Sequence, residues 1–482
     1  MLDSRDLENG TATGMMHYEK VRMRLMIVGA VAALALTACS TGTPTSPATV
    51  TSEVTVGAAP NASTGSSPAG EVPPPPSGDS ATGAASPPGS AAGTLLSPTS
   101  GSPSDTAATT SAATTATTTM TVNRAQINTQ PKNGATGVSP ITPVVVTAKN
   151  GELAAVAMTN PEGREVAGTL SADKTRWTST EPLGYNRSYT ISATAKDPVG
   201  TNDSTSKFTT LKPKQKVFPS FFPNPQMKTV GVGQPMVVIF DKPPVDRAAA
   251  EKTLTVKTVP AVQGAWYWWD DRTLHYRPKT YWKPGTKITV TAKVYGVNFG
   301  AGMYGETDRT LNLTIGDAKI AKIDDATKQM KVYINDKLNR TVPVSMGMDK
   351  TTTVNGKKIS FVTPSGTYVA QEKYKVKQMS SATYGLPTSY DLGYDKAIPL
   401  AVRLSGSGIF IHSAPWSVAD QGVRNVSHGC INIKPTDATW FYNTFSFGDI
   451  VQVTGTSTQL EPTDGFGDWN IPWNQWVQGS AL

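Results

Sequence analysis

Between about residues 122 and 315 the chain consists of short apolar and aromatic runs with turn residues between them. The runs recur about every ten residues and alternate apolar with polar side chains, which is typical of β-strands. A helical pattern of apolar residues is nearly absent. This part of the chain is therefore predicted to form antiparallel sheets. The clearest strands are expected at residues 144–146, 176–178, 189–191, 236–240, 254–256, 266–269 and 288–291.

The strand-rich part of the chain reads as two similar segments, residues 122–212 and 213–315. Thr-Ala-Lys ends corresponding strands at residues 194–196 and 291–293. The offset of about a hundred residues is the size of an immunoglobulin-like β-sandwich. Two such sandwich domains are predicted in tandem.

The first 38 residues have the features of an export signal. Basic residues at positions 20–24 precede an apolar stretch at 25–36, which is too short to cross a bilayer comfortably. Leu-Thr-Ala-Cys at its end resembles a lipobox, so residues 1–38 are predicted to be a lipoprotein signal peptide. Cys39 would then carry a lipid that anchors the protein to a membrane. The alternative is a cysteine there by chance.

Residues 39–121 are dominated by Ser, Thr, Pro, Ala and Gly. Such a segment cannot bury enough apolar surface to order itself, so it is predicted to be a disordered tether. A flexible chain of about 80 residues has a root-mean-square span of about 50 Å. That reach would lift the rest of the protein away from the lipid.

Charge and cysteine content narrow the function classes. The net charge is +8 over 482 residues, without a basic block of the kind that binds nucleic acid, so no nucleic-acid partner is expected. The two cysteines, Cys39 and Cys430, provide no disulfide framework. The folded domains must be stabilised by burial, and no cofactor or metal is expected.

Cys430 is the strongest candidate for a catalytic nucleophile. It lies in the run Ser-His-Gly-Cys-Ile-Asn at residues 427–432, two positions after His428. On an extended strand both side chains would share a face. His412 ends an apolar run that reads as a buried strand, and it can reach Cys430 only if the intervening loop folds back. A thiol attacks carbonyls as its thiolate, so a neighbouring base would activate it. The alternatives are a buried structural cysteine and a zinc site with two histidines.

The pattern His-x14-Ser-His-Gly-Cys-x-Asn resembles the active-site signature of the L,D-transpeptidases, whose catalytic domain is called YkuD. The surrounding sequence is most similar to the mycobacterial multidomain members. The resemblance implies that Cys430 is the nucleophile and His412 its base or ion-pair partner. The Ser413 carbonyl would orient the imidazole, and the N–H groups of Gly429 and Cys430 would stabilise an oxyanion. For His428, both a site-shaping and a direct catalytic role stay open.

The same resemblance implies a substrate cleft with a lid. Many relatives carry Arg where Asn432 stands, so the substrate contact of this position is the least defined. Met379, Phe410 and Trp416 are equally compatible with plain packing. The residues expected to line the cleft are Met379, Tyr384, Tyr394, Phe410, Trp416 and Asn432.

The implied reaction is the formation of 3→3 cross-links between peptidoglycan stem peptides, with release of D-alanine from a tetrapeptide donor. Carbapenems would acylate the same thiol. An L,D-carboxypeptidase using this thiol and a non-catalytic peptidoglycan-binding lipoprotein are the alternatives. The expected location is the outer face of the cytoplasmic membrane, with the catalytic end reaching into the cell wall.

The rest of the chain completes a mainly β architecture. Residues 316–456 are expected to form a β-rich YkuD-type catalytic domain with one short helix at 437–445. Within it, residues 363–368 read as a turn that enters a strand. The tryptophan-rich tail, residues 457–482, is too apolar to extend freely and is predicted to dock onto the folded domains. The aromatic run at 266–269 favours packing over sugar stacking, and His275 favours a structural role.

Overall fold

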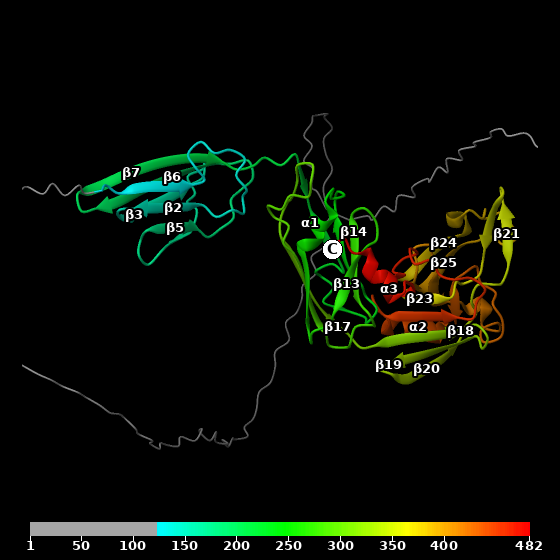
Figure 1. Cartoon of the computed structure of the whole chain (residues 1–482). Coiled ribbons are helices and arrows are strands. Elements are labelled where there is room, and N and C mark those ends of the chain that lie inside the picture. Colours follow the sequence, from blue (N-terminus) through cyan, green and yellow to red (C-terminus); the bar gives the residue numbers. More distant parts are fainter. Residues whose placement is uncertain (1–122) are drawn as a thin grey trace, which may run out of the picture. The chain divides into compact units, whose positions relative to one another are not determined.

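The computed structural model describes residues 123–482, which form a mainly β structure with few helices (Figure 1). The mainly β fold class predicted from the sequence is confirmed. The predicted signal peptide with Cys39 and the predicted tether lie outside the described residues. None of the helices in residues 123–482 has the length and apolar character needed to cross a bilayer.

The first sandwich packs a four-stranded sheet, in the order β1-β2-β5-β4, against a three-stranded sheet, in the order β3-β6-β7. Trp177, Leu153 and Tyr189 are buried in the core between them. Inward-facing positions alternate along β6, where every second residue is buried, as expected for a sheet with one solvated face. The strands are β1 (Gln126–Gln130), β2 (Val145–Lys149), β3 (Glu152–Thr159), β4 (Gly168–Leu170), β5 (Arg176–Ser179), β6 (Ser188–Asp197) and β7 (Gly200–Thr209).

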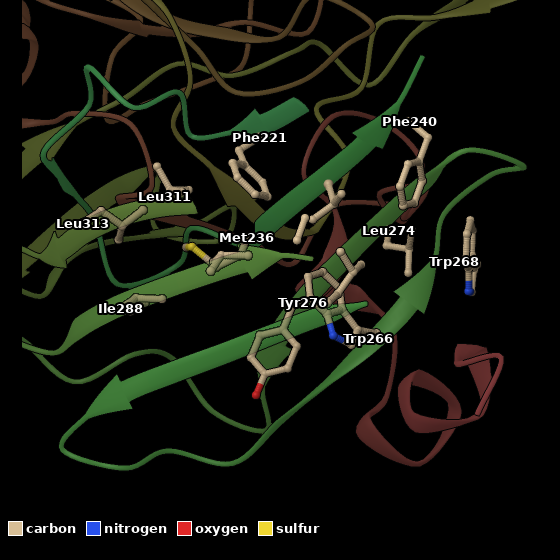
Figure 2. Packing of buried hydrophobic residues seen from close by; sticks show 14 of the residues in the cluster. Phe221, Met236, Phe240, Trp266, Trp268, Leu274, Tyr276, Ile288, Leu311 and Leu313 are labelled. Carbon is tan, nitrogen blue, oxygen red and sulfur yellow. The ribbon is translucent and has the colours of Figure 1, made fainter. Parts of the chain in front are cut away.

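The second sandwich packs the sheet β10-β17-β15-β12 against the sheet β13-β14-β11-β9, and β8 pairs with β16 beside them. Figure 2 shows its core, in which Met236, Trp266 and Leu274 lie among other buried apolar side chains. The strands are β8 (Gln215–Val217), β9 (Pro219–Phe222), β10 (Thr229–Val230), β11 (Met236–Phe240), β12 (Leu254–Val259), β13 (Gly264–Trp268), β14 (Thr273–Pro278), β15 (Lys287–Ala292), β16 (Met303–Gly305) and β17 (Arg309–Ile315).

One helix of the second sandwich was not expected from the sequence. The helix α1 (Arg247–Lys252) is only six residues long, too short to show an apolar period. Its start is nevertheless encoded locally, because the Asp246 carboxylate accepts a hydrogen bond of 2.8 Å from the Ala249 N–H.

The aromatic run in β13 alternates between two environments. Trp266 and Trp268 point into the sandwich core, where both are largely buried. Tyr267 stacks on Trp476 of the C-terminal tail, with ring centroids 4.8 Å apart, and Trp269 stacks on His275 at 4.5 Å. The run is therefore used for packing on both faces of its strand.

The third domain, where the sequence predicts the catalytic domain, contains a five-stranded sheet, β20-β19-β18-β28-β23, and a four-stranded sheet, β24-β25-β26-β27. Phe441 and Phe445, at the end of α2, are buried in the core of this domain. The expected helix is present from Pro435 to Thr444, and the fixed φ of Pro435 suits a first helical position. The elements are β18 (Lys319–Asp324), β19 (Gln329–Ile334), β20 (Lys337–Pro343), β21 (Thr351–Val354), β22 (Lys357–Ser360), β23 (Gly366–Val369), β24 (Lys373–Ser380), η1 (Ser381–Tyr384), β25 (Asp395–Arg403), β26 (Phe410–Ser413), η2 (Pro415–Ser417), β27 (Ile431–Ile433), α2 (Pro435–Thr444) and β28 (Ile450–Thr454).

The tail packs against both the second sandwich and the catalytic domain. Trp476 is fully buried and donates its indole N–H to the Ala265 carbonyl of β13 at 2.9 Å. Asn470 hydrogen-bonds the backbone of Thr367 in β23. The tail contains η3 (Asp468–Asn470), α3 (Trp473–Trp476) and η4 (Val477–Gly479).

Candidate active site

The candidate site lies where β26 and β27 run parallel at one edge of the four-stranded sheet. Ile411 pairs with Ile431 and His412 with Asn432 in this ladder. Cys430 immediately precedes β27, so it is two positions out of register with His412. With strands about 4.8 Å apart and about 3.3 Å of rise per residue, the two Cα atoms lie on the order of 8 Å apart. The loop from residue 414 to 427 does fold back, and it brings the backbone after Cys430 beside the strand that carries His412.

His412 is buried and is oriented by its own neighbour in sequence. Its Nδ1 lies 2.9 Å from the Ser413 carbonyl oxygen. Because a carbonyl only accepts hydrogen bonds, Nδ1 carries the proton and Nε2 has a free lone pair. Burial lowers the pKa of His412 to about 4, and the bond to Ser413 opposes this only in part. At neutral pH the imidazole is therefore an uncharged base.

The Cys430 thiol is half-buried among apolar side chains. Phe410, Met379 and Tyr394 pack around it. Its Sγ lies 3.7 Å from the Gly408 carbonyl, the geometry of a weak S–H donor. Burial raises the pKa of the thiol to about 11, with the Phe410 backbone and Arg403 opposing the rise. At neutral pH the thiol is thus protonated and the His412 imidazole is neutral, so the two do not form an ion pair.

The turn that carries Cys430 is held by one serine. The Ser427 hydroxyl donates to the Cys430 carbonyl at 2.5 Å and accepts from the Gly429 N–H at 3.2 Å. Gly429 has φ of +126°, which other residues adopt only with strain. His428 and Cys430 therefore do not lie on an extended strand, because the backbone bends at Gly429 and β27 begins only at Ile431.

The comparisons with known proteins agree with this geometry. Residues 318–453 match the L,D-transpeptidase catalytic domain, YkuD, and residues 135–298 match the bacterial Ig domain. The chain is 45% identical over 350 residues to L,D-transpeptidase 2 of Mycobacterium tuberculosis, an alignment that covers 72% of this chain and 83% of that protein. The chain belongs to the L,D-transpeptidase family.

Other members of the family are similar to this L,D-transpeptidase at lower sequence identity. L,D-transpeptidase 5 of M. tuberculosis is 37% identical over 363 residues, which cover 74% of this chain and 77% of that protein. A solved L,D-transpeptidase in complex with imipenem is 32% identical and covers 50% of this chain and 100% of its own, with a TM-score of 0.42.

In this L,D-transpeptidase the partly exposed His428 contacts two aromatic rings. Phe361 meets it edge-on, with centroids 4.9 Å apart, and Tyr394 lies at 5.2 Å. Burial lowers the pKa of His428, and its buried Nε2 has no hydrogen-bond partner within residues 123–482. These contacts support a site-shaping role. Phe361 was not recognised from the sequence, since nothing in its surroundings distinguishes it from a core residue.

The predicted lid residues pack together over the thiol. Tyr384, in η1, and Tyr394 have ring centroids 6.3 Å apart, and both contribute to the surroundings of Cys430. Burial raises the pKa of each phenol, so both stay protonated donors at neutral pH. The backbone of Ser381 pairs with Tyr394 and closes the segment between them into a loop.

Asn432 and Trp416 occupy different depths of the site. Asn432 is 3% exposed and donates to the Ser417 hydroxyl at 3.0 Å, so its amide is turned toward the loop rather than toward a ligand. Trp416 is 54% exposed and stacks against His412, with centroids 5.9 Å apart. Trp416 therefore borders the imidazole on its open side, while Asn432 supports the loop that carries the indole.

Residues 123–482 contain no group of three or more His, Cys, Asp or Glu side chains arranged to hold a metal ion. The zinc alternative for His412, His428 and Cys430 therefore lacks a suitable ligand set.

Proposed function

We propose that this L,D-transpeptidase forms 3→3 peptidoglycan cross-links with Cys430 as nucleophile and His412 as base. The observation that supports this most strongly is the pairing of β26 with β27, because it brings the strand of a neutral, Nδ1-protonated His412 beside the residues that directly follow Cys430. An uncharged base with a free Nε2 can accept a thiol proton as the sulfur attacks.

In the first half-reaction the Cys430 sulfur attacks the carbonyl carbon of the third residue of a tetrapeptide stem. Nε2 of His412 takes the thiol proton, and the carbonyl oxygen becomes an oxyanion. The Cys430 N–H is the donor left to that oxyanion, since the Gly429 N–H is engaged by Ser427. The carbon–nitrogen bond to the terminal D-alanine then breaks, and the amine leaves with the proton from His412.

In the second half-reaction the thioester is transferred to an amine on a neighbouring stem. His412 removes a proton from the attacking amine, a new amide bond forms, and the carbon–sulfur bond breaks. The proton returns to the sulfur. The apolar wall of Met379, Phe410 and Tyr394 around the sulfur would keep water from competing with the amine.

The proposal is tested with a carbapenem and with stem peptides. Mass spectrometry of the intact chain should show one carbapenem adduct, and a disaccharide-tetrapeptide should give a cross-linked dimer with loss of D-alanine. Cys430→Ala should give neither product. An adduct that persists in the Cys430→Ala chain would refute the assignment of the nucleophile, and D-alanine release without dimer would indicate a carboxypeptidase.

The proposal includes a lipid anchor at Cys39 and a location on the outer face of the cytoplasmic membrane. It is supported by the lipobox-like sequence before Cys39. Metabolic labelling with an alkyne fatty acid should mark the wild-type chain and leave Cys39→Ser unmarked. Equal labelling of both chains would contradict the anchor at this residue.

A further inference from the structure

Thr363 opens the segment at residues 363–368, which has no part in the chemistry described above. Its side chain is fully buried and bridges two backbone groups from distant parts of the sequence. The hydroxyl oxygen accepts from the Gly347 N–H at 2.9 Å and donates to the Gly429 carbonyl at 2.7 Å. Thr363 therefore holds the residue that directly precedes the nucleophile.

The direction of both hydrogen bonds follows from the groups involved. An N–H can only donate and a carbonyl can only accept, so the single hydroxyl proton lies toward Gly429. Every polar atom in this bridge is then satisfied, as buried groups require. A side chain without a hydroxyl would leave two buried backbone groups unpaired.

The Gly429 carbonyl and the Cys430 N–H belong to one planar peptide and point in opposite directions. Fixing the carbonyl oxygen therefore fixes the direction of the Cys430 N–H. This control matters because Gly429 has φ of +126° and no side chain to restrict its rotation. Ser427 binds the outer groups of the turn, the Gly429 N–H and the Cys430 carbonyl, and leaves the peptide between them to Thr363.

Thr363 is itself held on both sides. The Tyr368 hydroxyl donates to the Pro364 carbonyl at 2.6 Å, and the Ser365 N–H donates to the Thr458 carbonyl at 2.8 Å. On the other side, a Cβ at Gly347 would lie 1.9 Å from the Phe361 carbonyl oxygen, so only glycine allows the backbones to come this close. The hydroxyl is thus presented from a rigid support.

We infer that Thr363 is a positioning residue that aims the Cys430 N–H at the carbonyl oxygen of the bound stem peptide. The inference rests on the proposed function, because it assumes that Cys430 carries out acyl transfer through an oxyanion. Thr363 touches neither the substrate nor the sulfur in this role.

The experiment compares two reactions of the same thiol in the intact chain. Acylation by a carbapenem passes through an oxyanion, whereas alkylation by iodoacetamide does not. Loss of one oxyanion donor costs about 10²- to 10³-fold in rate in other enzymes, so a misdirected donor should cost at least about 10-fold. We expect Thr363→Val to lower the acylation rate constant by that factor and to change the alkylation rate constant by less than about 2-fold. Thr363→Ser, which keeps the hydroxyl, should restore acylation.

The ratio of the two rate constants keeps the test decisive. If Thr363→Val does not fold, Thr363→Ala removes the hydroxyl with less crowding and should lower the same ratio. An unchanged ratio in a folded Val or Ala variant would overturn the inference, as would a Ser variant no better than Val. These results are distinct from failure of the proposed function, in which the wild-type chain itself would not be acylated at Cys430.

Discussion

The two reacting side chains share one property, which is that burial keeps both uncharged. The pKa of His412 is lowered to about 4 and that of the Cys430 thiol is raised to about 11. A charged pair in this apolar site would lose hydration at both partners, and the Ser413 carbonyl, the Phe410 backbone and Arg403 offset that loss only in part. The thiol is therefore stored as S–H and becomes a thiolate only as the imidazole accepts its proton during attack.

This storage predicts an unusual pH profile for carbapenem acylation. The reactive form has a neutral His412, whose pKa is below the ordinary value of about 6.5. Lowering the pH should therefore leave the acylation rate unchanged through pH 6 and reduce it only as the imidazole is protonated near pH 4. Above pH 6 the acylation rate should change again only near pH 11, where the Cys430 thiol ionises. Single-turnover acylation rates measured by mass spectrometry would give both limbs.

Two controls separate protonation of the site from unfolding. Tryptophan fluorescence at each pH shows whether the chain is still folded, and His412→Gln should abolish the acidic limb together with most of the rate. A midpoint between pH 6 and 7 in folded protein would mean that His412 is hydrated when it reacts, contrary to its burial.

At the scale of elements, the loop between β26 and β27 is anchored by buried polar side chains. Ser417 accepts from Asn432 at 3.0 Å, and Gln421 donates to the Ala414 carbonyl at 3.1 Å. Ser417 and Asn432 are nearly inaccessible to water. A loop of this length would otherwise have little to hold Trp416 against His412.

Asn432→Ala should therefore lower the free energy of unfolding of the catalytic domain by about 1–3 kcal/mol, the usual cost of leaving a buried partner unpaired. Urea denaturation followed by fluorescence measures this change. In a double-mutant cycle with Ser417→Ala, the double variant should lose less unfolding free energy than the sum of the two single losses, because each substitution removes the same hydrogen bond.

The exposed Val423 in the same loop provides the matched control. Val423→Ala should change the unfolding free energy by less than about 0.5 kcal/mol, as surface substitutions usually do. Strict additivity of the Asn432 and Ser417 substitutions would contradict the anchoring role of their hydrogen bond.

Sequence reasoning was most successful where a local pattern carries the information. The strand β11 was predicted with its observed bounds, and the buried strand that carries His412 was recognised from its apolar run. Sequence reasoning failed where a residue's role depends on a hydrogen-bond partner far away in the sequence. The bond from Thr363 to Gly429 spans 66 positions, and no periodicity encodes it. The bend at Gly429 was also missed, since glycine permits an extended as well as a left-handed backbone.

At the scale of the whole described structure, the tail encloses a buried cation. The Arg277 guanidinium lies 4.3 Å from the ring centroid of Trp476 and 4.8 Å from that of Trp469, and it donates to the Ile471 carbonyl at 2.7 Å. Burial lowers its pKa to about 10, so it remains charged at neutral pH. Nearby, His275 and Asp468 are buried as a hydrogen-bonded pair at 2.7 Å. The tail thus covers His275 and Arg277 of β14.

Removing the Trp476 ring should destabilise the second sandwich more than any other part of the chain. The indole is fully buried, and replacing a buried tryptophan by alanine costs about 3–5 kcal/mol. In differential scanning calorimetry of the intact chain, Trp476→Ala should lower the transition of the second sandwich by about 10 °C or more. Trp473→Ala is the matched control, because that ring is partly exposed and lies 5.4 Å from the same guanidinium. Trp476 contacts Ala265, Tyr267 and Arg277 of the second sandwich, so the transition of the first sandwich should stay in place. Equal shifts for the two tryptophan variants would show that the tail is not the closing element of the second sandwich.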